Sequence, residues 1–164
     1  MSEERISLLV VDDEEPIRTL LARVGERAGF SVDMARDGVE ALEMLRHKDY
    51  MIAIVDLMMP RLSGYELVQQ ISTLEPRPFV IVATALTNSA VASLDDSMVR
   101  RVIRKPFDIH AVAASLIETA QQIAEARADD ASTPAEVIAI APTGEVTPLE
   151  IHQKSAPDDP TPKT

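Results

Sequence analysis

Val55-Asp56-Leu57-Met58-Met59-Pro60 is the stretch that decides the fold, because it joins an apolar run to a carboxylate and then to a loop. The run that leads into it, Met51–Val55, is continuously apolar and β-prone. Such a run is typical of a strand buried on both faces, and in parallel sheets helices cover these strands. Reaction sites in such sheets lie outside the carboxyl ends of the strands. We therefore expect Asp56 at the rim of a buried sheet.

Four more segments read as strands, and apolar residues at helical spacing follow each of the five. The strand segments are residues 6–11, 30–35, 79–83 and 99–104. The helical pattern is weakest after the fourth strand, over residues 87–94. Regular alternation of strand and helix predicts an α/β fold with right-handed crossovers. We expect a doubly wound, five-stranded parallel sheet with helices on both faces.

The composition limits the chemistry and the location. Apolar residues make up 46% of the 164 residues and aromatic residues only 3%, so the core must be aliphatic. The absence of cysteine excludes disulfides, thiolate metal sites and cysteine nucleophiles. The polar, acidic N-terminus argues against a secretory signal, and no run approaches the ~18 apolar residues of a membrane helix. We expect a cytoplasmic protein with no membrane contact.

The formal net charge of −11 disfavours nucleic acid as a partner, because an acidic chain repels phosphates unless it segregates a basic patch. One basic cluster exists: Arg100, Arg101, Arg104 and Lys105. We interpret this cluster as a solvated strand edge.

The chain divides into a domain over residues 1–128 and a tail over residues 129–164. The tail holds six of the eleven prolines and seven acids against two lysines. This composition predicts an acidic, proline-rich and mostly flexible segment. Within it, residues 136–151 are a candidate short hairpin, although Pro148 weakens its second arm.

Five side chains with reactive chemistry stand at strand ends: Asp12, Asp13, Asp56, Thr84 and Lys105. Clustered carboxylates repel one another unless a cation lies among them, and hard oxygen ligands suit Mg²⁺. A threonine hydroxyl can donate to an anionic oxygen, and a lysine supplies a point charge. Since a carboxylate can form an aspartyl phosphate, the set fits phosphoryl transfer to Asp56, with Mg²⁺ and Lys105 offsetting the transition-state charge. Each signal is weak alone, and their combination carries the interpretation.

From Ser7 to Arg127 the sequence resembles the receiver domain of bacterial two-component response regulators, of the stand-alone type. The resemblance is carried by Val11-Asp12-Asp13-Glu14, Val55–Pro60 with Ser63-Gly64, Thr84-Ala85, and Lys105-Pro106-Phe107. It implies the strand order 2-1-3-4-5 and a usually cis Lys105–Pro106 bond.

The resemblance also implies a role for each site residue. Asp56 would be the phosphoacceptor. Asp56, Asp13 and the backbone carbonyl of Met58 would bind Mg²⁺, and Asp12 would do so mainly through water. Thr84 would move to the phosphoryl group, and Lys105 would pair with it.

The chain departs from the family at Val102, where Tyr or Phe often stands three residues before the lysine. A small aliphatic side chain has little to swing inward. We therefore expect that Thr84 and the loop of residues 85–87 transmit activation, or that activation is weaker than in family members with the aromatic residue.

Three functions are compatible with parts of this sequence. The first is a phosphorylation-switched receiver, not a metabolic enzyme, that takes its phosphoryl group from a histidine kinase or a histidine phosphotransfer protein. It would signal by protein contact through the face of the fourth helix, fifth strand and fifth helix, including Arg100 and Arg101, with a homodimer as a candidate state. The alternative is a phosphorylation-independent binding module of the same fold, which only Val102 supports. A phosphohydrolase is disfavoured, because Met58 stands where such enzymes commonly place a second aspartate.

Overall fold

The computed structural model describes residues 5–94, 97–129, 138–140 and 146–148. Strands and helices alternate through residue 129, as the sequence predicts. In chain order the elements are β1 Ser7–Val11, α1 Glu15–Arg27, β2 Ser31–Ala35, α2 Gly38–His47, β3 Ile52–Asp56, α3 Gly64–Ser72, β4 Phe79–Thr84, α4 Asn88–Val91, β5 Val99–Arg104, α5 Ile109–Asp129, β6 Ile138–Ile140 and β7 Val146–Pro148.

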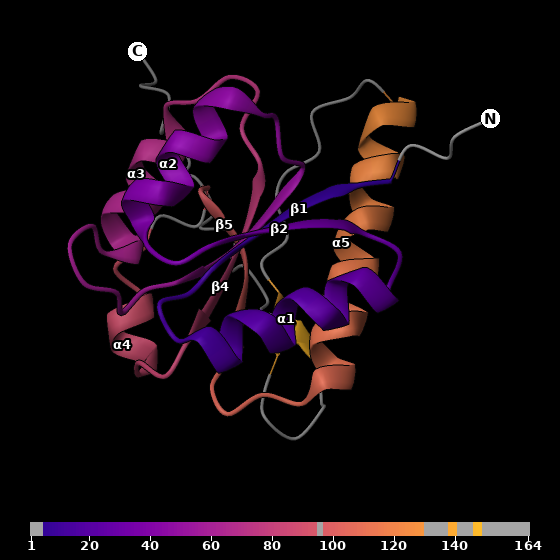
Figure 1. Ribbon diagram of the computed structural model, residues 1–164. Helices are drawn as coiled ribbons and strands as arrows, with labels where there is room; N and C mark the ends of the chain where they lie inside the picture. The colour runs from indigo at the N-terminus through magenta and orange to yellow at the C-terminus, as the bar shows by residue number, and fades with distance from the viewer. Residues whose placement is uncertain (1–4, 95–96, 130–137, 141–145, 149–164) are drawn as a thin grey trace, which may run out of the picture.

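The sheet has the order β2-β1-β3-β4-β5-β6-β7. Its first five strands are parallel and have the predicted order 2-1-3-4-5. Helices α1 and α5 lie on one face, and α2 and α3 lie on the other (Figure 1). The predicted doubly wound fold is therefore confirmed, and it brings the carboxyl ends of β1, β3, β4 and β5 to one edge.

Two aliphatic cores hold the layers together, because successive side chains of a strand point to opposite faces. Leu9 and Val11 of β1 pack on the α2–α3 side, whereas Leu8 and Val10 pack on the α1–α5 side. All five residues of β3 are buried. The continuous apolar run before Asp56 thus reflects a strand covered on both faces.

Arg101 corrects the expectation of a solvated basic edge. Its side chain lies against α5, on the side of the core that holds Ile103, and the residue is only 1% exposed. The guanidinium Nη1 donates to Glu118 Oε2 at 2.6 Å. A long cationic side chain can be buried when its charge is paired. Arg101 therefore cannot meet a partner on the surface, although Arg100 and Arg104 remain partly exposed.

Two short strands of the tail extend the sheet beyond the predicted five. Strand β6 pairs in parallel with β5, with Arg101 opposite Ile138 and Val102 opposite Ala139. Strand β7 pairs antiparallel with β6. Both fall within residues 136–151, the candidate hairpin, while the rest of the tail and its predicted flexibility lie outside the described residues. Among the helices of the described ranges, none combines the length and the apolar character needed to cross a membrane.

Candidate functional site

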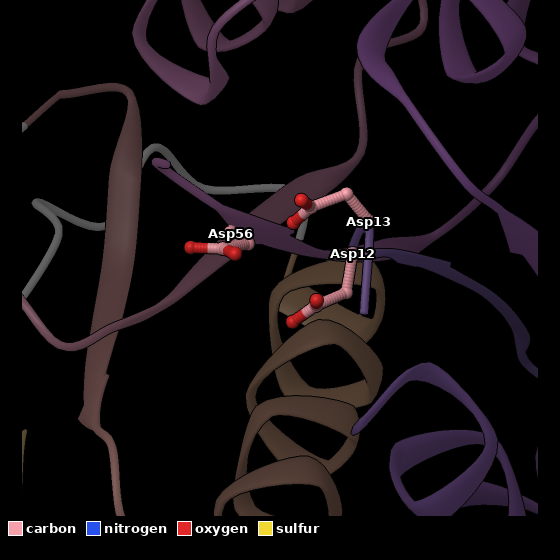
Figure 2. Close-up of side chains that lie close together, drawn as sticks. All are labelled: Asp12, Asp13 and Asp56. Carbon is pink, nitrogen blue, oxygen red and sulfur yellow. The ribbon is translucent and has the colours of Figure 1, made fainter. Parts of the chain in front are cut away.

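The three predicted carboxylates meet at the edge where the parallel strands end. Asp12 and Asp13 directly follow β1, and Asp56 is the last residue of β3. One oxygen from each lies within 4.8 Å of the others. Figure 2 shows the Asp12 and Asp13 side chains one above the other, both pointing toward the side on which Asp56 lies. Asp12 and Asp56 are buried and Asp13 is exposed, so the cluster opens to solvent on the Asp13 side.

Backbone contacts fix the position of Asp12. Its Oδ1 accepts the Glu14 N–H at 2.9 Å, and its own N–H donates to the Ala35 carbonyl at 3.2 Å. Arg18, on the first turn of α1, donates from Nη1 to the Asp12 carbonyl at 2.8 Å. The sequence analysis did not include Arg18, because no motif marks a cation that binds a backbone carbonyl. These contacts hold the end of β1 against the start of α1.

Asp56 is also buried, at 4% exposed, next to the fully buried Asp12. Its Oδ1 accepts the Met58 N–H at 3.1 Å, and its Oδ2 lies 3.2 Å from Lys105 Nζ. Burial raises the pKa of the Asp56 carboxyl, and the Met58 N–H and the Lys105 charge offset only part of that rise. Asp56 is therefore a desolvated carboxylate with one oxygen next to an ammonium.

Lys105 connects the carboxylates from the end of β5. Its Nζ lies 2.8 Å from Asp12 Oδ2, 3.2 Å from Asp56 Oδ2 and 3.8 Å from Glu14 Oε1. Burial lowers the pKa of Lys105, but its bonds with Asp12 and Asp56 outweigh burial and raise the pKa overall. The ammonium therefore stays charged across the physiological range.

The charge balance of the cluster suits a divalent cation. Three carboxylates against one ammonium leave two negative charges at one site. The donor atoms are all oxygens, which hard cations such as Mg²⁺ prefer. Residues that fit such an ion are therefore present and converge, as the sequence predicts.

Thr84 lies at the same edge of the sheet, but its hydroxyl is hydrogen-bonded to the loop that follows β4. The residue is fully buried at the end of β4, and its Oγ1 accepts the Leu86 N–H at 3.1 Å. Within the described part of the chain, no hydrogen bond joins this hydroxyl to the carboxylates. The structure thus places Thr84 beside the cluster without contact to it.

Gly64 supports the site through a close backbone approach that the sequence analysis did not identify. A Cβ on Gly64 would lie 2.1 Å from the Asp56 carbonyl oxygen and 2.5 Å from Leu57 Cα. A capping box formed by Ser63 and Glu66 starts α3 at this point. Only glycine lets α3 begin this close to the end of β3.

The remaining predicted features are also located. The Lys105–Pro106 peptide bond is cis, as the resemblance implies. The Met58 side chain is 60% exposed, and the metal-binding role of its carbonyl stays a prediction. Val102 is partly buried and packs against the core on the α2–α3 side.

Comparison with known proteins gives consistent matches. The family model of the response regulator receiver domain matches residues 8–117. Response regulator MprA of Mycobacterium sp. strain KMS is 35% identical over 113 residues, which cover 68% of this chain and 49% of MprA. Response regulator RR06 of Streptococcus pneumoniae strain D39 is 32% identical over 104 residues, covering 63% of this chain and 48% of RR06. The chain thus spans about half the length of these curated relatives.

Solved structures agree with the fold. The receiver domain of Francisella response regulator 1452 is 25% identical with a TM-score of 0.67, covering 73% of this chain and 99% of that domain. Response regulator TrrA from Thermotoga maritima, solved in complex with Mg²⁺ and BeF, is 28% identical with a TM-score of 0.63. That match covers 70% of this chain and 98% of TrrA.

Proposed function

Because the chain belongs to the response regulator receiver domains of two-component systems, we propose that it is a phosphorylation switch whose phosphoacceptor is Asp56. The family is one of signalling proteins and not of metabolic enzymes. One observation carries the proposal: the desolvated Asp56 carboxylate lies 3.2 Å from the Lys105 ammonium, within an acidic cluster suited to a divalent cation.

The donor is a phosphohistidine on a histidine kinase or on a histidine phosphotransfer protein. An Asp56 oxygen attacks phosphorus, a P–O bond forms, and the P–N bond to imidazole breaks. The imidazole nitrogen keeps the electron pair and takes up a proton. Lys105 offsets the charge of the phosphoryl oxygens from its position beside Oδ2. Within the described residues the Thr84 hydroxyl accepts the Leu86 N–H and donates to no other group, so its proton can bond a phosphoryl oxygen.

The residues that would hold Mg²⁺ are Asp12, Asp13, Asp56 and the backbone carbonyl of Met58, with Asp12 acting mainly through water. When bound, the ion would neutralise part of the charge that develops on the transferring phosphoryl group. That TrrA was solved in complex with Mg²⁺ and BeF supports Mg²⁺ as the ion.

Output would follow from protein contact in the cytoplasm, without nucleic acid or membrane. The candidate surface is the face of α4, β5 and α5, and the partner is a downstream protein or a second copy of this chain. Two contacts link the site to α4: the Tyr65 hydroxyl donates to the Ala90 carbonyl at 3.0 Å, and Arg104 donates to Asn88. With Val102 in place of an aromatic residue, the signal would pass through Thr84 and the loop to α4.

Intact mass after incubation with acetyl phosphate and Mg²⁺ tests the proposal. We expect a gain of one phosphoryl group, ~80 Da, because a carboxylate nucleophile forms an acyl phosphate. The gain should disappear in Asp56→Asn and with EDTA, and it should persist in Asp33→Asn, a control carboxylate on β2. No gain, together with no binding of beryllofluoride, would favour the phosphorylation-independent module instead.

A further inference from the structure

Strand β5 would be the edge of a five-stranded receiver sheet. It is six residues long, and its outer backbone groups would have no partner within such a sheet. An unpaired edge of this length is a template for strand pairing with another chain. In this protein β6 pairs with that edge instead.

The register shows which backbone groups β6 covers. The Lys105 N–H donates to the Thr84 carbonyl, on the β4 side. Because successive residues of a strand direct their backbone groups to opposite sides, Val102 directs its N–H and carbonyl away from β4. Val102 lies opposite Ala139 of β6, so residues 138 and 140 bracket its backbone groups. The tail strand thus occupies the pairing position that a second chain would need.

Charge favours the tail as the occupant. Strand β5 carries the partly exposed Arg100 and Arg104 in a chain whose net charge is −11. Residues 129–164 carry seven acids against two lysines. An acidic segment is therefore drawn to the basic strand and is held at high effective concentration by the chain itself.

The hairpin also makes the edge of the sheet less able to pair with another strand. The outermost strand becomes β7, which has three residues and ends at Pro148. Short strands and proline make poor templates for pairing, because proline lacks the backbone N–H. The sheet thus exchanges a long regular edge for a short interrupted one.

The pairing between β6 and β5 is short. Among the described residues, β6 has three residues, and two of them lie opposite residues of β5. A longer strand can therefore displace β6 from this edge.

We propose that the hairpin of β6 and β7 is an intramolecular cap on the β5 edge, which a second copy of this chain must displace to pair there. The cap blocks strand pairing at this edge whether or not Asp56 is phosphorylated, so the inference stands independently of the proposed phosphoryl transfer.

The test compares the full chain with Ile140→Pro, because residue 140 supplies the N–H expected to bond the Val102 carbonyl and proline lacks one. The matched control is Ile151→Pro, the same replacement in the tail beyond β7. Two quantities are measured without a phosphoryl donor: amide hydrogen exchange at Val102, and the mass distribution by sedimentation velocity across protein concentrations.

We expect exchange at Val102 to be at least tenfold faster in Ile140→Pro than in the native chain, and unchanged in Ile151→Pro. We also expect Ile140→Pro to dimerise at concentrations where the native chain is monomeric, and its Val102 amide to regain protection as the dimer forms. Equal exchange in all three proteins would overturn the cap. So would faster exchange in a chain that stays monomeric, or a native chain that dimerises as strongly as the variant.

Discussion

Asp56 experiences two opposing demands, since the fold desolvates it and the proposed reaction needs it ionised. Burial raises the pKa of its carboxyl, while Lys105 and the Met58 N–H pull that pKa back only partly. The ionised form therefore destabilises the folded protein. A site that carries this strain is typical of function rather than of stability.

Asp56→Asn should stabilise the metal-free protein by about 1 kcal/mol at neutral pH, because it removes a buried charge and keeps the shape. The pKa of Asp56 is higher in the folded state than its value of 3.8 in the unfolded chain, so the native chain loses stability as the pH rises from 3.8 through the folded-state pKa. Below pH 3.8 the carboxyl is protonated in both states, and the stability gained by Asp56→Asn should vanish. Urea unfolding in EDTA at several pH values measures it, with the exposed Asp13→Asn as the control expected to change little. A loss of stability in Asp56→Asn at neutral pH would contradict the argument.

Lys105→Met should cost about 3 kcal/mol, because it leaves the buried Asp12 carboxylate without its ammonium at 2.8 Å. The raised pKa of Lys105 means that its stabilisation is complete below the unfolded value of 10.5 and is lost as pH rises through the folded value. Urea unfolding at neutral pH measures the loss. The control is Lys48→Met, whose ion pair with Asp33 is largely exposed and should cost at most about 1 kcal/mol. Equal costs for the two lysines would show that Lys105 adds nothing beyond a surface charge.

At this scale the sequence predicted the residues whose position follows from a strand end. Asp12, Asp13, Asp56 and Lys105 converge because parallel strands deliver their carboxyl ends to one edge. Arg18 was missed because it binds a backbone carbonyl, which no side-chain pattern reveals. Nor does the sequence alone show that Thr84 bonds its own loop rather than the carboxylates.

Among the elements, α4 is the one held least by its own sequence. It has four residues, none of them buried, and its N-cap Thr87 makes no side-chain capping bond. Its main anchors come from neighbours, through Tyr65 of α3 and Arg104 of β5. The weak helical pattern over residues 87–94 reflects this, because an element held by tertiary contacts leaves little periodic signal.

Tyr65→Phe should loosen α4, because it removes the hydroxyl that bonds the Ala90 carbonyl at 3.0 Å. A hydrogen bond of about 1 kcal/mol corresponds to roughly fivefold faster amide exchange in α4. Hydrogen exchange at Val91 and Ala92 measures this. The control is Tyr50→Phe, whose hydroxyl bonds Asp33 far from α4 in sequence, and which should leave α4 unchanged. Equal amide exchange in α4 in the two variants would show that the Tyr65 hydroxyl does not anchor α4.

The start of α3 depends on Gly64. Gly64→Ala should cost about 3 kcal/mol, because the new Cβ would overlap the backbone of Asp56 and Leu57. Gly29→Ala is the matched control: no atom lies within 4 Å of its Cβ, and only its φ of +95° costs about 1 kcal/mol. Urea unfolding of both variants gives the comparison. A Gly64→Ala cost no larger than that of Gly29→Ala would show that α3 can shift away from β3.

Element prediction succeeded where burial shapes the sequence and failed where it does not. The continuous apolar runs of β1 and β3 reflect two covered faces, so these strands could be predicted directly from the sequence. The burial of Arg101 could not be predicted, because it depends on Glu118 of α5, seventeen positions away. The docking of β6 on β5 is likewise a long-range contact that no local pattern specifies.

For the whole molecule, both the net charge and the carboxylate cluster make the stability of the fold depend on added salt. The net charge of −11 means that any added salt stabilises the chain somewhat by screening repulsion. A specific cation would add to this by binding the folded state alone, since the cluster of Asp12, Asp13 and Asp56 exists only when the ends of β1 and β3 meet. The two effects can be separated at constant ionic strength.

Mg²⁺ should therefore raise the free energy of unfolding of the native full-length chain at constant ionic strength, by about 2.7 kcal/mol when its concentration is a hundred times the dissociation constant. Urea unfolding over a MgCl₂ series, with KCl lowered to compensate, measures this rise. Asp13→Asn and Asp56→Asn should each flatten the dependence, since each replaces one of the three carboxylates that meet within 4.8 Å by a neutral amide. Asp33→Asn, which removes the same charge elsewhere, should keep it. A rise of equal size in all four proteins would assign the effect to general screening and would leave the cluster without a bound ion. A rise confined to the native chain and Asp33→Asn would locate the ion at the same carboxylates that surround the proposed phosphoacceptor.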